Sequence, residues 1–137
     1  MGFDQFGIKS FVSETRVEKF VTYLEQGKVV TTRCQKCKVI TFPPKVDCVA
    51  CGCTEVAWVE IKETGTLETF TTVMVGPAGF EKETPYTLVV VQFPCGIRIL
   101  GRLDKKIPAE EIRIGMKLKA EPVKISPDRF SYQLGKV

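Results

Sequence analysis

The chain has 137 residues, of which 44% are hydrophobic and 26% charged, a composition typical of soluble globular proteins. It has no histidine, so it lacks the commonest general base of enzymes. Six cysteines occur without a secretory signal or an apolar run long enough to span a bilayer. We therefore expect a cytoplasmic protein with reduced thiols and no membrane association.

Positive charge is concentrated in the second part of the chain. Residues 95–137 hold ten Lys or Arg against five Asp or Glu, whereas residues 1–94 are nearly neutral. This excess fits an anionic partner. It fits equally well the lysines that protect exposed strand edges in a soluble β protein.

Residues 13–26 are predicted to form an amphipathic helix, with Ser13 as a suitable N-cap and Gly27 well placed to end it. Apolar residues recur at helical spacing and form one stripe: Val17, Phe20, Val21 and Leu24. The preceding segment is rich in phenylalanine: Phe3, Phe6 and Phe11. This N-terminal unit, residues 1–27, either folds back on the chain or docks on a partner. The density of aromatic residues leads us to predict that the arm binds a partner.

Four cysteines form the most specific pattern of the chain. They occur as C-x2-C, ten residues and C-x2-C: Cys34, Cys37, Cys48 and Cys51. Each pair places two thiolates on one tight turn, called a knuckle below, and two facing knuckles complete the tetrahedral S4 site that zinc prefers. Four protein ligands leave no open coordination position, so the predicted zinc is structural. A disulfide pair or a redox site explains two matched pairs less well.

Residues 28–62 are predicted to form a rubredoxin-like zinc ribbon in the order strand, knuckle, strand, knuckle, strand. Pro43-Pro44 stops pairing after the second strand. A core this small is not expected to fold without metal. Cys53 could compete as a ligand, but its spacing from Cys48 is poor, and we interpret it as a bystander. Nearby cations are expected to offset the charge of the site: Arg33, Lys36, Lys38 and Lys45.

Residues 63–137 are predicted to form a five-stranded OB-fold barrel with antiparallel strands and a short helical connection between the third and fourth. An SH3-like barrel is the alternative. A flat sheet is disfavoured because it would leave long unprotected edges. The apolar run Leu88–Val91 indicates a central strand, and Phe70 and Phe93 are expected to point into the barrel. The chain as a whole is thus predicted to be mainly β.

Several blocks of sequence, in this order, resemble the zinc-ribbon/OB-fold proteins of the domain-of-unknown-function 35 family. They are CQKC, FPPKVDCVACGC, GTLETFT, GPAGF, TPYTLVVV, GIRILGRL and IRIGMKLK. The resemblance covers the helix to the C-terminus and implies a helix, then a zinc ribbon, then an OB barrel. It departs from the family at Cys53, where we expect a polar residue, and at Lys38, where many members have glycine. Lys38 can hold its knuckle only if its φ need not be positive.

The resemblance implies an accessory subunit of a thiolase-fold enzyme, one that holds coenzyme A or forms part of its channel at the interface. Independently of the resemblance, such a site needs cations for the phosphates and an apolar groove for the pantetheine arm. The best candidates are Gly79, Phe80, Lys82, Arg98 and Arg102. No catalytic residue is predicted, because the chain has no histidine and Cys95 lies in a hairpin turn without a visible activating partner.

Two other functions compete with this one. OB barrels commonly bind single-stranded nucleic acid through aromatic platforms in a basic groove, but strand aromatics are few here and a net charge of +4 is modest. The chain could also be a free-standing carrier or scaffold that makes no contact with coenzyme A.

Overall fold

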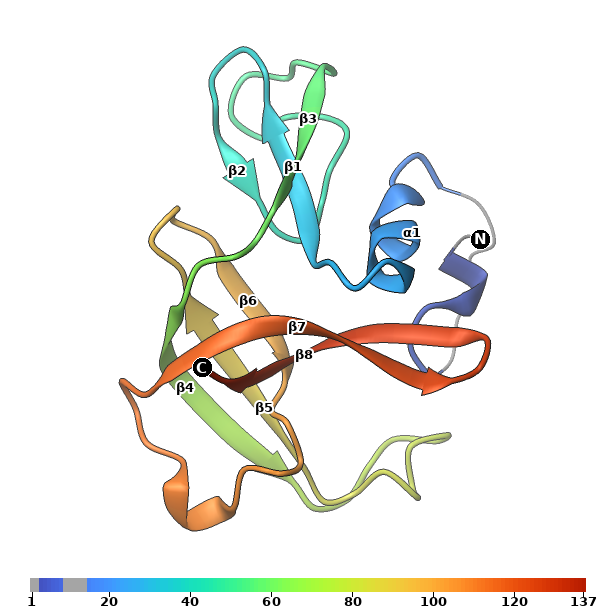
Figure 1. Cartoon of the computed structure of the whole chain (residues 1–137), viewed down its shortest axis with the longest axis vertical. Helices are drawn as coiled ribbons and strands as arrows, with labels where there is room; N and C mark the ends of the chain where they lie inside the picture. Colours follow the sequence, from blue (N-terminus) through green and yellow to red (C-terminus); the bar gives the residue numbers. More distant parts are fainter. Residues whose placement is uncertain (1–2, 9–14) are drawn as a thin grey trace.

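The computed structural model describes residues 3–8 and 15–137. A three-stranded sheet lies at one end of the molecule and a five-stranded barrel at the other, with the helix α1 beside them (Figure 1). This confirms the predicted mainly β fold. The elements are η1 (Phe3–Gln5), α1 (Lys19–Glu25), β1 (Val30–Cys34), β2 (Ile40–Thr41), β3 (Val56–Glu60), β4 (Gly65–Val73), β5 (Tyr86–Gln92), β6 (Arg98–Arg102), η2 (Ala109–Glu111), β7 (Lys117–Ser126) and β8 (Arg129–Lys136).

The smaller sheet has the order β2-β1-β3, and both pairings are antiparallel. Two buried threonines on β1 tie it to the end of β2 and to the segment that follows. The Thr31 hydroxyl donates to the Thr41 carbonyl. Thr32 Oγ1 donates to the Lys45 carbonyl at 2.8 Å and accepts from the Lys45 N–H at 2.9 Å. The two bonds with Lys45 keep the chain alongside β1 after the prolines have ended the ladder.

The larger sheet has the order β6-β5-β4-β7-β8 with antiparallel pairing throughout. It closes where Leu103, just after β6, forms a parallel bridge to Leu134 of β8, and the Asp104 N–H donates to the Leu134 carbonyl at 2.8 Å. The closing contact is therefore parallel, unlike the all-antiparallel pairing expected. The first strand pairs with the second and fourth, and the third meets the fifth. With η2 between the third and fourth strands, this is the predicted OB barrel.

Helix α1 is shorter than predicted. Ser13 lies outside the described residues, and residues 16–18 form a turn before Lys19. The predicted C-terminal glycine is confirmed: Gly27 has φ 84°, its N–H donates to the Leu24 carbonyl at 3.1 Å, and the Lys28 N–H donates to the Tyr23 carbonyl at 2.9 Å. This pair of bonds is a Schellman motif.

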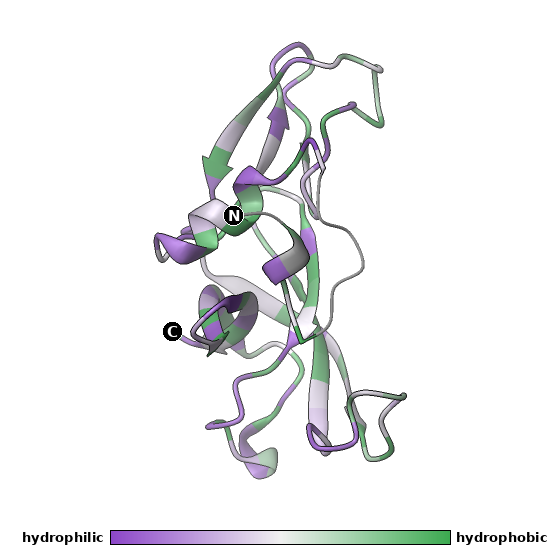
Figure 2. Cartoon of the chain, turned by 90° about the vertical axis from the view of Figure 1, so that its right-hand side faces the viewer, coloured by the Kyte–Doolittle hydropathy of each residue, from purple (hydrophilic) through white to green (hydrophobic). Residues whose placement is uncertain are grey.

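The apolar stripe of α1 folds back on this chain. Phe20, Val21 and Leu24 are buried in one core with residues of the ribbon and the barrel. Along the strands in Figure 2, hydrophobic and hydrophilic stretches alternate, as expected for elements with one buried face. The helix thus contributes to the core between the two sheets instead of presenting its stripe to a partner.

The described part of the aromatic arm also packs on its own chain, and its binding to a partner stays a prediction. The rings of Phe3 and Phe6 lie 6.0 and 5.8 Å from that of Phe20. The Gly7 N–H donates to the Phe130 carbonyl at 2.7 Å, and Arg129 Nε donates to the Gly7 carbonyl at 2.7 Å. Both phenylalanines are half-buried, because they pack against apolar side chains of α1 and β8. Phe11 lies outside the described residues.

Strand β5 is central, as predicted, since it pairs with β4 and β6. Phe93 is buried, whereas Phe70 is 39% exposed. After a bulge that follows Leu67, Phe70 lies opposite the buried Val89 and so shares the inward face, as expected, but it is not enclosed there. There the strand already approaches the β4–β5 loop, residues 74–85, which projects from the barrel (Figure 1). Among the described residues, no helix is both long and apolar enough to cross a bilayer.

Candidate metal centre and ligand surface

The two knuckles have matching backbone hydrogen bonds. In the first, the Cys34 N–H donates to the Val39 carbonyl at 2.9 Å and the Lys38 N–H to the Cys34 carbonyl at 3.0 Å. In the second, the Cys48 N–H donates to the Cys53 carbonyl at 2.9 Å and the Gly52 N–H to the Cys48 carbonyl at 2.9 Å. The sequence C-x2-C thus folds twice into the same turn, and both turns aim two sulfurs at one point.

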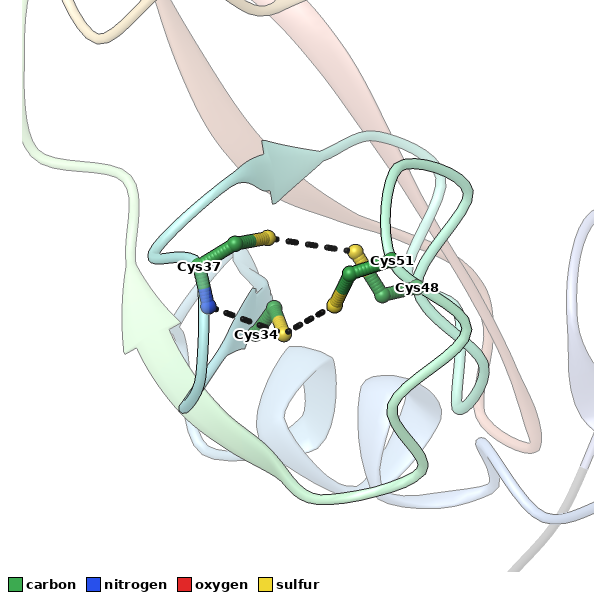
Figure 3. A group of neighbouring side chains, drawn as sticks. All are labelled: Cys34, Cys37, Cys48 and Cys51. Atoms are coloured by element: carbon green, nitrogen blue, oxygen red, sulfur yellow. Dashed lines mark hydrogen bonds between the residues drawn. The ribbon is translucent and has the colours of Figure 1, made fainter.

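The four sulfurs converge in one cluster, as Figure 3 shows, and all lie within 4.8 Å of one another. Cys34 Sγ is 3.6 Å from Cys51 Sγ, and Cys37 Sγ is 3.4 Å from Cys48 Sγ. A tetrahedron with Zn–S bonds of about 2.3 Å has edges of roughly 3.8 Å, close to these separations. A disulfide requires about 2.05 Å between sulfurs, and all six cysteines are free. The donor set therefore fits zinc.

Backbone groups prepare two of the sulfurs for the thiolate state. The N–H of Cys37, helped by that of Lys36, lowers the pKa of Cys34 to about 6. The N–H groups of Cys51 and Ala50 lower the pKa of Cys48. The pKa of Cys51 is raised to about 12: the N–H of Cys53 acts to lower it, but desolvation and the neighbouring sulfurs outweigh that effect. Four crowded thiols cannot all ionise by themselves, and a divalent cation would relieve their repulsion.

The knuckles differ in the residue that follows the second cysteine. Gly52 has φ 76°, which glycine adopts without strain. Lys38 has φ 67°, so the condition set for it is not met: this lysine does take a positive φ. The strain of a non-glycine residue there is about 1–2 kcal/mol. The matched hydrogen bonds of the knuckle hold it in place.

Cys53 lies outside the sulfur cluster, as predicted for a bystander. Its Sγ accepts from the Glu55 N–H at 3.4 Å, and only the other four cysteines of the ribbon converge. Of the cations expected around the site, Arg33 is half-buried, and three are exposed: Lys36, Lys38 and Lys45.

The structure brings together only part of the predicted coenzyme A set. Phe80, on the β4–β5 loop, lies beside Arg102, whose guanidinium also stacks on Tyr86. The same loop carries Gly79, with φ 93°, and the exposed Lys82. Arg98 instead forms an ion pair with Glu68 at 2.9 Å.

Both arginines therefore already have carboxylate partners, since Arg102 pairs with Glu83 at 2.9 Å. Among the five predicted residues, only Lys82 is a cation without an ion pair.

A partly exposed apolar strip lies between the two arginines, and sequence analysis missed it. On the outer face of the barrel, Val90 of β5 pairs with Leu100 of β6, and Leu88 pairs with Arg102. Leu100 is 59% exposed. Its place on the outer face follows from alternation, because Ile99 is fully buried. The period of two in GIRILGRL could have revealed this outward leucine.

Cys95 is exposed in the hairpin turn, as predicted. Desolvation raises the pKa of its thiol, and Glu63 raises it further. This is the reverse of the activation that a catalytic cysteine needs.

Comparison with known proteins identifies both parts of the chain. Residues 22–57 match the family model described as ChsH2, rubredoxin-like zinc ribbon domain, and residues 58–122 match that of ChsH2, C-terminal OB-fold domain. A DUF35 domain-containing scaffold protein of Methanocaldococcus jannaschii is 29% identical over 124 residues, covering 89% of this chain and 87% of the relative. Another from Pyrococcus furiosus is 30% identical over 103 residues, covering 75% and 74%.

Two solved structures share the fold. The structure titled Ltp2-ChsH2(DUF35) aldolase superposes with a TM-score of 0.77 at 24% identity and covers 92% of this chain and 98% of that chain. A DUF35 protein of unknown function from Sulfolobus solfataricus gives a TM-score of 0.55 at 21% identity over 85% and 83% of the two chains. The zinc-ribbon and OB-fold matches, together with the two relatives, show that the chain belongs to the DUF35 family of scaffold proteins.

Proposed function

We propose that this chain is a non-catalytic accessory subunit of a thiolase-fold enzyme that acts on acyl-CoA thioesters. The observation that carries the proposal is its membership of the DUF35 scaffold family. The aldolase named with a DUF35 protein in the solved structure supports an enzyme as the partner. Both enzyme types make or break a carbon–carbon bond.

The chemistry of the side chains in this sequence favours a non-catalytic role. Thioester cleavage needs an activated nucleophile and a proton shuttle. The sequence has no histidine, and the raised pKa of Cys95 disfavours its thiolate. Catalysis is therefore assigned to the partner.

The metal centre has a structural part in this proposal. Cys34, Cys37, Cys48 and Cys51 would hold the ion. When bound, zinc would supply folding free energy to the ribbon and, with four sulfur ligands, leave no position for a substrate.

Coenzyme A is proposed to contact the barrel at the β4–β5 loop and along the outer face of β6. Lys82 is the best placed cation for a phosphate, because Arg98 and Arg102 are already paired. The apolar strip of Leu88, Val90 and Leu100 would suit the pantetheine arm. Gly79 and Phe80 would line the loop side of the same site.

The same face argues against single-stranded nucleic acid, the competing function. OB folds bind such strands on the face of their second and third strands, here β5 and β6. That face presents aliphatic side chains at its centre, and its two arginines are neutralised by Glu68 and Glu83. A phosphate-tracking groove would need uncommitted cations there.

The proposal is tested by isolating the untagged chain from its native source and identifying what co-purifies. A thiolase-fold enzyme is the expected companion. The purified complex is then assayed with two substrates. A thiolase cleaves 3-oxoacyl-CoA and needs free coenzyme A as the nucleophile, whereas an aldolase cleaves 3-hydroxyacyl-CoA to a carbonyl product without it. Isolation with single-stranded nucleic acid in a salt-sensitive complex would overturn the proposal.

Contact with coenzyme A is tested separately on the same complex. Lys82→Gln should weaken coenzyme A binding, while Lys119→Gln, an equal charge change on β7, should leave it unchanged. Equal binding by both variants would favour a scaffold that does not touch the ligand.

A further inference from the structure

The side chain of Arg102 joins β6 to the β4–β5 loop. Its Nη1 donates to Glu83 Oε1 at 2.9 Å, and its Cζ lies 4.2 Å from the ring centroid of Tyr86 and 5.8 Å from that of Phe80. The side chains of the ion pair are only 25% and 31% exposed, so water screens it less than a fully exposed surface pair. One guanidinium thus contacts the base of the loop and two residues within it.

The loop is compact enough for these contacts to place all of it. The Phe80 N–H donates to the Pro77 carbonyl at 2.9 Å, and the Glu83 N–H donates to the Phe80 carbonyl at 3.0 Å. A Cβ added to Gly76 would lie 2.9 Å from the Phe80 carbonyl oxygen, so the two arms of the loop touch. A group that fixes Phe80 and Glu83 therefore fixes the loop as a unit.

Arg98 offers an internal comparison, because it lies on the same face of β6. It also forms an ion pair of 2.9 Å, but with Glu68, which belongs to the barrel, and its side chain is 63% exposed. Its bond lies within the sheet and does not reach the loop. Both arginines pair with a glutamate, but Arg98 connects two strands of the barrel, whereas Arg102 connects β6 to the β4–β5 loop.

We propose that Arg102 is a clamp that fixes the β4–β5 loop against β6, a positioning residue rather than a cation that receives a ligand's phosphate. The loop then has its final conformation before any ligand or partner arrives. Phe80 and Lys82 are presented in one arrangement, which lowers the entropy cost of whatever binds them. The clamp itself does not depend on the identity of the enzyme partner.

Amide hydrogen exchange of the zinc-loaded full-length chain, measured by NMR, tests the clamp. In Arg102→Gln, the amides of Phe80 and Glu83 should exchange about tenfold faster, the size expected for a partly buried ion pair and a ring contact. Arg98→Gln should leave these two amides unchanged. Val89 and Val91 of the barrel core serve as references in every variant.

Unchanged exchange at Phe80 and Glu83 in Arg102→Gln would overturn the clamp, as would an equal rise in Arg98→Gln. If Arg102→Gln also lost protection at Val89, the barrel itself would be weakened, and Glu83→Gln decides the matter. That variant removes the same ion pair from the loop side without altering a barrel strand. It must speed exchange at Phe80 with Val89 still protected, or the proposal is wrong.

Discussion

The ribbon and the barrel bury very different cores. In the barrel, aliphatic side chains from all five strands and their connections meet in one interior, including Leu67, Val91, Ile99, Leu118 and Leu134, each at most 1% exposed. The most deeply buried side chains of β1 are two threonines, at 0% and 1% exposure, and β2 has only two residues. Apolar burial can sustain the barrel, whereas the ribbon depends on the sulfur cluster and on α1.

The largest expected effect is the loss of the metal centre. A Cys48→Ser variant, or chelation of the wild type, should unfold the ribbon and leave the barrel folded, because metal binding supplies much of the ribbon's folding free energy. Trp58, the single tryptophan, lies on β3 and reports on the ribbon by its emission. Amide protection at Val89 reports on the barrel.

The matched control for that experiment is Cys53→Ser, since Cys53 lies outside the cluster. It should retain about one zinc per chain with unchanged Trp58 emission. Full metal retention in Cys48→Ser would show that Cys48 is not a ligand. Simultaneous unfolding of the ribbon and the barrel would show that the barrel is not stable by itself.

The next largest effect is expected in the barrel core. Leu134→Ala should lower the free energy of unfolding by about 3 kcal/mol, because the side chain is fully buried where the barrel closes. Leu100→Ala, at a site that is 59% exposed, should cost well under about 1 kcal/mol. Urea denaturation of the zinc-loaded variants measures both. Similar losses of unfolding free energy in the two variants would show that Leu134 is not packed in the core where the barrel closes.

A smaller effect is expected from Tyr132, which bridges β8 to β6. Its hydroxyl donates to the Leu100 carbonyl at 2.7 Å, and Gly101 leaves the space that the ring occupies. Tyr132→Phe should cost about 1 kcal/mol, the value of one such hydrogen bond. Denaturation at neutral pH checks this figure.

The same tyrosine predicts a pH dependence. Burial raises the pKa of Tyr132 to about 12 from its ordinary value of 10. Since the folded state keeps the proton more tightly, the stabilisation is complete below pH 10 and is lost as the pH rises through 12. Denaturation between pH 9 and 12 should show a steeper loss in the wild type than in Tyr132→Phe. Parallel curves would place the titration elsewhere.

The smallest effect compares the two knuckles directly. Lys38→Gly should stabilise the ribbon by about 1 kcal/mol, because it relieves the strain of a positive φ. Gly52→Ala should destabilise it by a similar amount, about 1 kcal/mol, for the opposite reason. Competition with a zinc chelator ranks the three proteins. If Lys38→Gly binds zinc more weakly than the wild type, the prediction is wrong. The lysine side chain then adds more to the free energy of zinc binding than the strain of its positive φ takes away.

Features set by short stretches of sequence were predictable. The cysteine spacing identified the cluster, Gly27 marked the helix end, and alternation in the last 75 residues gave the strands of an OB barrel. These depend on neighbours within a few residues.

Features set by distant contacts were not predictable. The arm was expected to bind a partner because nothing in its sequence shows that Phe6 pairs with Phe130. Likewise, Arg102 was interpreted as a ligand group because its pairing with Glu83 depends on how the β4–β5 loop returns to β6. In both cases a local pattern indicated a role for these side chains, whereas the contacts that they make within the chain depend on tertiary packing.

Reconstitution with the partner shows whether the chain supports an enzyme without catalysing a reaction itself. Thioester cleavage of 3-oxoacyl-CoA is measured for the chain alone, for the co-purifying enzyme alone and for the two together. We expect no turnover by the chain alone and a clear gain in turnover when the chain is added to the enzyme. The proposed function is wrong if the chain alone shows turnover that Cys95→Ala abolishes, or if the enzyme's turnover is the same with and without the chain.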